Sequence, residues 1–246
     1  MLKIDRTIRR KDISRHVWTQ LRPVPISEVK LWIFVLTFLM LDTLCVFPVI
    51  GNTYASEYFF AVIIPTAFIN IWAITILFRN FYSTQKETIY FILANSIVLA
   101  FCCFIVAQKI VYIDTKVEST AFFIISILFY FGWIGYFTQY IFRKYANMKW
   151  RYSQKNFLLD MLGVILLLLP SNGYNFYHFY IKGNPFEEYI SAFVYLCLGI
   201  LPIYISIQFL HRLLYIRFNS HLFRLSQLSR KEIKQEKAKG KTIKVN

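Results

Sequence analysis

The sequence predicts an all-α integral membrane protein, a bundle of six transmembrane helices with amphipathic helices on the cytoplasmic side at both ends of the chain. Two observations lead to this fold class. Hydrophobic residues make up 57% of the 246 residues, far more than a soluble surface can cover. They also gather in blocks of about 20 residues, the length of helix that crosses roughly 30 Å of hydrocarbon.

Six apolar blocks divide residues 31–210, which we interpret as the transmembrane domain. Five blocks are long enough to cross a bilayer: residues 31–50, 59–78, 89–110, 121–142 and 189–210. The block 157–170 has only 13 residues before Pro170, so its length also fits a re-entrant segment.

The positions of the basic residues decide the number of crossings. Of the 28 Lys and Arg residues, 25 lie in four segments: 1–30, 79–88, 143–156 and 211–246. Short loops rich in Lys and Arg remain in the cytoplasm, so we place these segments on one side. That placement requires block 157–170 to cross as well. We therefore predict six crossings of the cell (inner) membrane, with the N-terminus and the C-terminus both cytoplasmic.

The basic segment 1–30 contains a short amphipathic pattern. Ile13, Val17 and Leu21 recur every four residues, and Pro23 ends the run. This spacing predicts a helix that lies in the inner headgroup layer and leads into the first span.

Residues 211–246 continue the last span as a basic amphipathic helix and end in a polar tail that we expect to be disordered. One side of this helix carries a basic residue at every seventh position: Arg217, Arg224 and Lys231. Each basic side chain near an anionic membrane surface contributes about 1 kcal/mol of attraction. We expect this side to contact anionic lipid or a cytoplasmic partner.

Polar side chains at bilayer depth are the first candidates for function, because they are costly there and usually face the protein interior. Asp42 and Asn70 are each the twelfth residue of their block, and the two blocks cross in opposite directions. Both side chains should therefore lie near the midplane, where we expect Asp42 to face Asn70 or another polar group of the bundle. Asn95 in the third block extends the same polar strip. We interpret this group either as a clasp between helices or as a path that couples protons or cations.

Residues 171–189, on the outer side, are unusually aromatic for a solvated loop. Aromatic side chains favour the headgroup layer, so we interpret this segment as an interfacial hairpin or half-helix. The alternative is a lid over an outward-facing cavity, in which His178, Glu187 and Glu188 would contact a ligand.

Other distinctive residues are assigned to packing or to the membrane surface. Lys109, near the outer end of the third block, is expected to extend its amine to the headgroups. Gly132 and Gly135 offer small surfaces on which another helix could pack. The four cysteines lie within apolar blocks, without the spacing of a metal site, so no metal or cofactor is expected: Cys45, Cys102, Cys103 and Cys197.

No enzymatic motif is found in the sequence. Glu187 and Glu188 match the start of the E-E-x-x-x-R motif of intramembrane CAAX-type proteases, but Ala192 occupies the arginine position. Serine-protease, zinc and phosphate-binding motifs are also missing, so we predict no catalytic residue and no enzyme. The net charge of +15 follows from membrane topology, and without a nucleic-acid-binding motif we expect no nucleic acid as partner.

We therefore predict a non-enzymatic, partner-binding subunit of a membrane complex, assembled from further copies of this chain or with another subunit. A transporter or channel subunit, such as an ion-conducting oligomer, is the alternative. Six spans, an amphipathic N-terminal elbow, an outer element before the last span and cytoplasmic termini resemble in architecture the membrane half of ABC-2 type exporters. This resemblance implies that a separate ATPase would drive transport.

Overall fold

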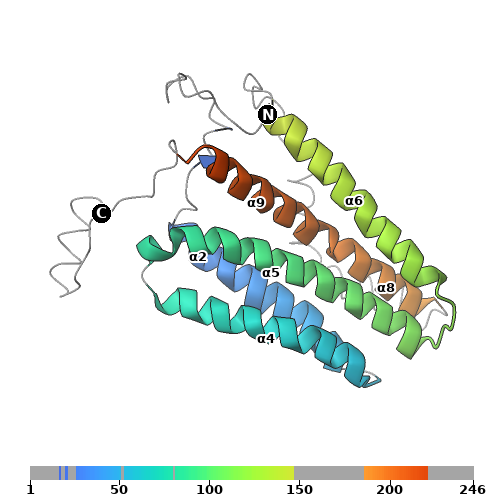
Figure 1. The fold of residues 1–246 in the computed structure, drawn as a ribbon. Helices are drawn as coiled ribbons and strands as arrows, with labels where there is room; N and C mark the ends of the chain where they lie inside the picture. The colour runs from blue at the N-terminus through green and yellow to red at the C-terminus, as the bar shows by residue number, and fades with distance from the viewer. Residues whose placement is uncertain are drawn as a thin grey trace.

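The computed structural model describes residues 17, 20–21, 26–50, 53–79, 81–146 and 186–220 (Figure 1). These residues form helices joined by short connections, and no strand occurs among them. Five helical segments are long and apolar enough to cross a membrane: Val29–Ile50, Ser56–Phe78, Thr84–Asp114, Ala121–Tyr145 and Glu187–Phe218. The predicted all-α class with apolar spans is confirmed, whereas block 157–170 and the C-terminal segment from residue 221 lie outside the described residues.

The first span is largely a π-helix: η2 (Phe34–Val46) lies between α2 (Ile26–Ile33) and α3 (Phe47–Ile50). Apart from Leu36, its buried residues recur at every fourth position: Val29, Ile33, Thr37, Leu41, Cys45 and Val49. In an α-helix, four residues overshoot one turn by about 40°, so such a stripe would wind around the helix. The wider turns of η2, with their i→i+5 hydrogen bonds, compensate for this drift and keep the stripe facing the bundle.

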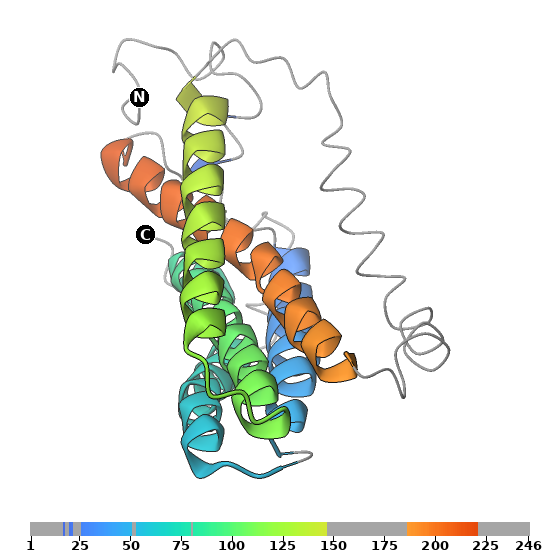
Figure 2. The same cartoon turned by 90° about the vertical axis from the view of Figure 1, so that its right-hand side faces the viewer.

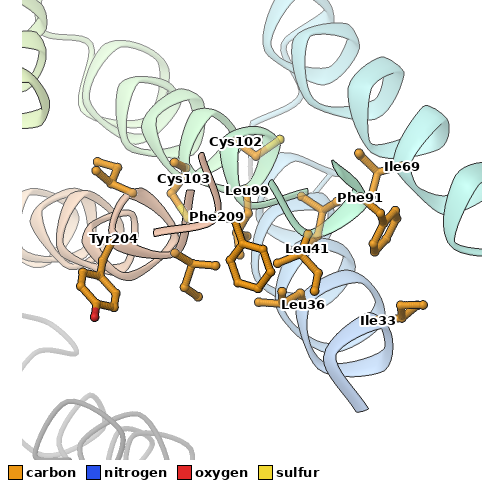
Figure 3. Packing of buried hydrophobic residues seen from close by; sticks show 14 of the residues in the cluster. Ile33, Leu36, Leu41, Ile69, Phe91, Leu99, Cys102, Cys103, Tyr204 and Phe209 are labelled. Carbon is orange, nitrogen blue, oxygen red and sulfur yellow. The ribbon is translucent and has the colours of Figure 1, made fainter. Parts of the chain in front are cut away.

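The third span lies at the centre of the bundle. It consists of α5 (Phe81–Lys109) and the π-turn η3 (Ile110–Asp114), and it packs against the first span, against α4 (Ser56–Phe78) and against the last span. In its most apolar stretch 56% of the residues are buried. The apolar core gathers around it, and Figure 3 shows side chains from several helices meeting there: Leu36 and Leu41 from the first span, Phe91 and Leu99 from α5, and Phe209 from the last span.

The last span consists of α8 (Glu187–Leu198) and α9 (Ile200–Phe218), interrupted only at Gly199. It runs in the same direction as α6 (Ala121–Ala146), because contacts advance together along both helices: Tyr130 with Gly199, Phe137 with Tyr204 and Tyr145 with His211. Figure 2 shows α6 on the outside of the bundle, crossing the line of α8 and α9. The end of α6 and the start of α8 therefore lie at opposite ends of the bundle.

The two ends of the bundle differ in charge. Basic residues gather at the end where α6 and α9 finish, which we call the basic end: Lys30, Arg79, Lys86, Arg143, Lys144, Arg212 and Arg217. Acidic residues gather at the opposite end, together with Lys109 and Lys116, and we call it the acidic end: Glu57, Asp114, Glu118, Glu187 and Glu188. This arrangement follows the alternation of basic segments in the sequence.

Candidate intramembrane polar site

Asp42 and Asn70 meet as the sequence predicts. Asn70 Nδ2 donates a hydrogen bond to Asp42 Oδ1 at 2.9 Å, joining η2 to α4. Both side chains are half-buried, and Asn70 Oδ1 accepts no hydrogen bond from the described residues. The contact is thus confirmed, and a functional role for the pair remains a prediction.

Asn95 forms a second polar contact with the first span. Its Nδ2 donates to Thr37 Oγ1 at 2.8 Å, and both side chains are fully buried. Asn95 Oδ1 and the neighbouring Ser96 Oγ are buried without a hydrogen-bond partner among the described residues. The predicted strip therefore consists of two pairs, which fasten η2 to α4 and to α5.

Sulfur atoms extend these contacts along the same helices. Cys45 Sγ lies 3.9 Å from Cys103 Sγ, and Thr66 Oγ1 lies 3.9 Å from Cys102 Sγ. Cys45, Cys102 and Cys103 belong to the buried core around α5, where Figure 3 shows Cys102 and Cys103. Within the described ranges, no three His, Cys, Asp or Glu side chains are placed to hold a metal ion.

The expectation for Lys109 is wrong. Its side chain is 1% exposed, and Nζ donates to the carbonyl oxygen of Pro48 at 3.0 Å instead of reaching the headgroups. Pro48 lies in α3, at the end of the first span, and the last carbonyl groups of a helix have no partner within the helix. They therefore offer the amine an acceptor inside the bundle.

Glu187 and Glu188 form the first turn of α8 at the acidic end, Glu187 half-buried and Glu188 exposed. Carboxylates in a first turn are stabilised by the unpaired N–H groups of the helix, which explains their position without a ligand. Arg217 is exposed in the last turn of α9, where the helix dipole favours a cation. The other predicted candidates, His178, Arg224 and Lys231, lie outside the described residues.

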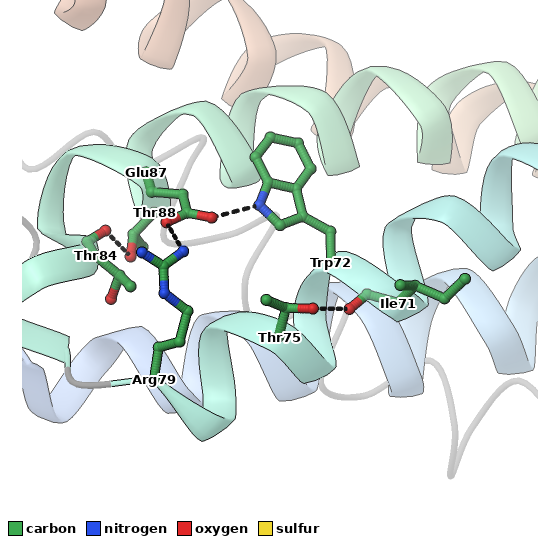
Figure 4. Close-up of polar contacts among 7 residues, drawn as sticks. All are labelled: Ile71, Trp72, Thr75, Arg79, Thr84, Glu87 and Thr88. Carbon is green, nitrogen blue, oxygen red and sulfur yellow. Dashed lines mark hydrogen bonds and ion pairs between the residues drawn. The ribbon is translucent and has the colours of Figure 1, made fainter.

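Sequence reasoning missed Glu87, which joins α4 to α5 near the basic end (Figure 4). One carboxylate oxygen accepts from Trp72 Nε1 at 3.0 Å, and the other accepts from Arg79 Nη1 at 2.7 Å. The Trp72 ring also packs edge-on against Phe91. The only indication of this contact in the sequence is that Arg79 and Glu87 are 8 residues apart, on either side of the turn between α4 and α5.

The described residues form a helical protein with five segments long and apolar enough to cross a membrane, in which polar side chains join the first segment to its neighbours. No model of a protein family, no curated protein and no solved structure matches the chain.

Proposed function

We propose that the protein is a non-enzymatic subunit of a membrane complex, and that its first partner is a second copy of the same chain. The helix that we assign to this contact is α6. In its most apolar stretch 11% of the residues are buried, against 28% or more in each of the other described spans.

One face of α6 carries the proposal. Gly132, Gly135 and Gln139 are exposed, and their spacing of three and four places them on one side of the helix. No atom lies within 4 Å of a Cβ built at either glycine. We call these three residues the α6 open face. Small residues allow another helix backbone to approach closely, so this face suits helix packing in a membrane.

Gln139 explains why the partner is a second copy. It lies about 9 Å from the middle of α6, at hydrocarbon depth, and makes no hydrogen bond within the described residues. An amide has both donors and an acceptor, so two copies of Gln139 can satisfy each other across a two-fold axis. Interhelical hydrogen bonds of this kind stabilise helix pairs in lipid.

Co-purification of two differently tagged copies tests the proposal. Gly135→Trp should abolish recovery of the second tag, because the indole blocks close approach. Ile134→Trp is the matched control, since it places the same indole on another side of α6 and should preserve recovery. Gln139→Cys should form an intermolecular disulfide on oxidation. Equal recovery from both tryptophan variants, or a monomer in all samples, would contradict the proposal.

We also propose the six-crossing topology, with the basic end and both termini facing the cytoplasm of the cell (inner) membrane. The parallel directions of α6 and the last span support it, because residues 147–186 must return the chain from the basic end to the acidic end. Block 157–170 is the apolar part of that connection. Reporter fusions after residues 150 and 180 should lie on opposite sides of the membrane; the same side for both would refute the sixth crossing.

A transporter subunit is the second candidate, favoured by the irregular helices. The first span is π-helical around Asp42, and the last is interrupted at Gly199. Interrupted helices and π-bulges are frequent at transport and other functional sites. If Asp42 couples ion or proton movement, Asp42→Asn should abolish flux in reconstituted vesicles while preserving folding. Unchanged flux would remove the coupling role.

A further inference from the structure

A cluster of polar and aromatic side chains lies at the basic end, around the ring of Tyr145. Gln20 Nε2 donates to the Tyr145 hydroxyl at 2.6 Å. The His211 ring stacks on the Tyr145 ring with centroids 4.9 Å apart, and Lys144 Nζ lies 5.7 Å from the same centroid. We call Gln20, Lys144, Tyr145 and His211 the Tyr145 cluster. It joins the N-terminal segment, α6 and α9.

Two atoms of this cluster are buried without a hydrogen-bond partner in the described part of the chain: His211 Nδ1 and Gln20 Oε1. The His211 and Gln20 side chains are 2% and 4% exposed. Buried polar atoms in native proteins are nearly always hydrogen-bonded, so unsatisfied atoms of this kind point to a bound group. Both side chains contact Tyr145, so the two unsatisfied atoms belong to one cluster.

The cluster lies at the boundary between the hydrocarbon core and the headgroup layer. At 1.5 Å per residue, Lys144 lies about 17 Å from the middle of its span and His211 about 13 Å from the middle of its own. The hydrocarbon core has a half-thickness of roughly 15 Å. By this measure His211 lies just inside the edge of the hydrocarbon core and Lys144 just outside it, at the basic end of the bundle.

We propose that the Tyr145 cluster binds the headgroup of an anionic phospholipid that carries hydroxyl groups, such as phosphatidylglycerol. The phosphate oxygens accept from the Lys144 ammonium group and from an N–H at His211 Nδ1. A headgroup hydroxyl donates to Gln20 Oε1. Basic pockets between spans on the cytoplasmic side are known to hold acidic lipids. This site differs from the general attraction expected of the exposed Arg217, because its unsatisfied polar atoms are buried within one cluster.

Lipid-dependent thermal unfolding in detergent tests the site. Phosphatidylglycerol should raise the melting temperature of the unmodified protein, whereas phosphatidylcholine and inorganic phosphate should not. Lys144→Gln should lose this shift. Arg143→Gln is the matched control, because it removes the same charge from the exposed neighbouring position and should keep the shift. Equal melting temperatures of the two variants in phosphatidylcholine show that both are folded.

Three results would overturn the proposal: equal shifts with phosphatidylglycerol and phosphatidylcholine, equal losses in both variants, or the same shift with inorganic phosphate. The hydroxyl contact has its own test. The protein should bind phosphatidylglycerol about fivefold more tightly than phosphatidate, the factor expected from one neutral hydrogen bond. Gln20→Met, which lacks the acceptor, should remove this preference, and an unchanged preference would exclude the contact.

Discussion

Gly199→Ala is expected to destabilise the protein, although alanine favours helices. Gly199 has a φ of −67°, which any residue can adopt, so the backbone does not require glycine. An added Cβ would, however, lie 2.7 Å from Cζ of Tyr130 and closer still to its hydroxyl oxygen. Carbon atoms normally pack at about 3.5–4.0 Å, so the ring must move by about 1 Å.

The expected magnitude follows from two opposing effects. Overpacking a well-packed interior costs roughly 1–3 kcal/mol, whereas replacing a helical glycine by alanine stabilises by about 0.5–1 kcal/mol. The net loss at Gly199 is therefore about 1 kcal/mol, within a range of about 0–2.5 kcal/mol. Gly132→Ala is the matched control, because nothing lies within 4 Å of its Cβ. That variant should be as stable as the unmodified protein or more stable.

Denaturant-induced unfolding in mixed micelles, followed by circular dichroism, measures both variants at concentrations where the protein is monomeric. A double-mutant cycle then identifies the obstacle. In the background of Tyr130→Leu, whose side chain is shorter, Gly199→Ala should stabilise the protein by about 0.5–1 kcal/mol, so the coupling energy equals the overpacking cost of about 1–3 kcal/mol. An equal cost in both backgrounds would refute the assignment of Tyr130 as the clashing group.

Three further predictions use the same unfolding measurement. Asp42→Asn should change the free energy of unfolding by less than about 0.5 kcal/mol, because the new amide oxygen still accepts the hydrogen bond from Asn70. Asp42→Leu, which has no acceptor, should cost about 1–3 kcal/mol. Equal stabilities of the two variants would contradict the role of the Asp42–Asn70 contact as a clasp. Glu87→Gln, which removes the half-exposed ion pair with Arg79, should cost about 0.2–1 kcal/mol, and a cost that persists in 1 M salt would exclude this cause. Lys109→Met should destabilise the protein by about 1–3 kcal/mol, because a buried carbonyl loses its donor; a neutral effect would restore the headgroup interpretation.

The sequence predicts the described spans well because apolar length is a direct requirement of the bilayer. It places their ends less well. The third block was expected at 89–110, but the apolar span extends over Thr84–Asp114. Its polar first turns remain helical where Glu87 accepts hydrogen bonds from Trp72 and Arg79. Such contacts depend on the neighbouring helix, so hydropathy along one block cannot show them.

The π-helix of the first span is a feature that the sequence carries but that helical periodicity does not predict. A repeat of four residues is longer than the 3.6 residues of an α-helical turn and shorter than a π-helical turn. The periodicities used to recognise helices in a sequence include only the α-helical one. The contacts of the first span explain the repeat: Thr37 contacts Asn95 and Cys45 contacts Cys103, and both partners lie on α5. One face of the first span must then serve a single neighbour over its whole length.

Lys109 and His211 show the limit of reading polar residues by depth. Both lie toward the end of a span, where sequence alone suggests contact with headgroups. Each is nevertheless almost fully buried, Lys109 because a helix-end carbonyl accepts a hydrogen bond from its amine, and His211 because Tyr145 and Tyr215 stack against its ring. The two burials have different consequences: the amine of Lys109 has its acceptor within the bundle, whereas His211 Nδ1 has none among the described residues. A buried polar group with its hydrogen-bond partner inside the bundle contributes to stability. A buried polar group whose partner must come from outside the chain is a candidate for ligand binding.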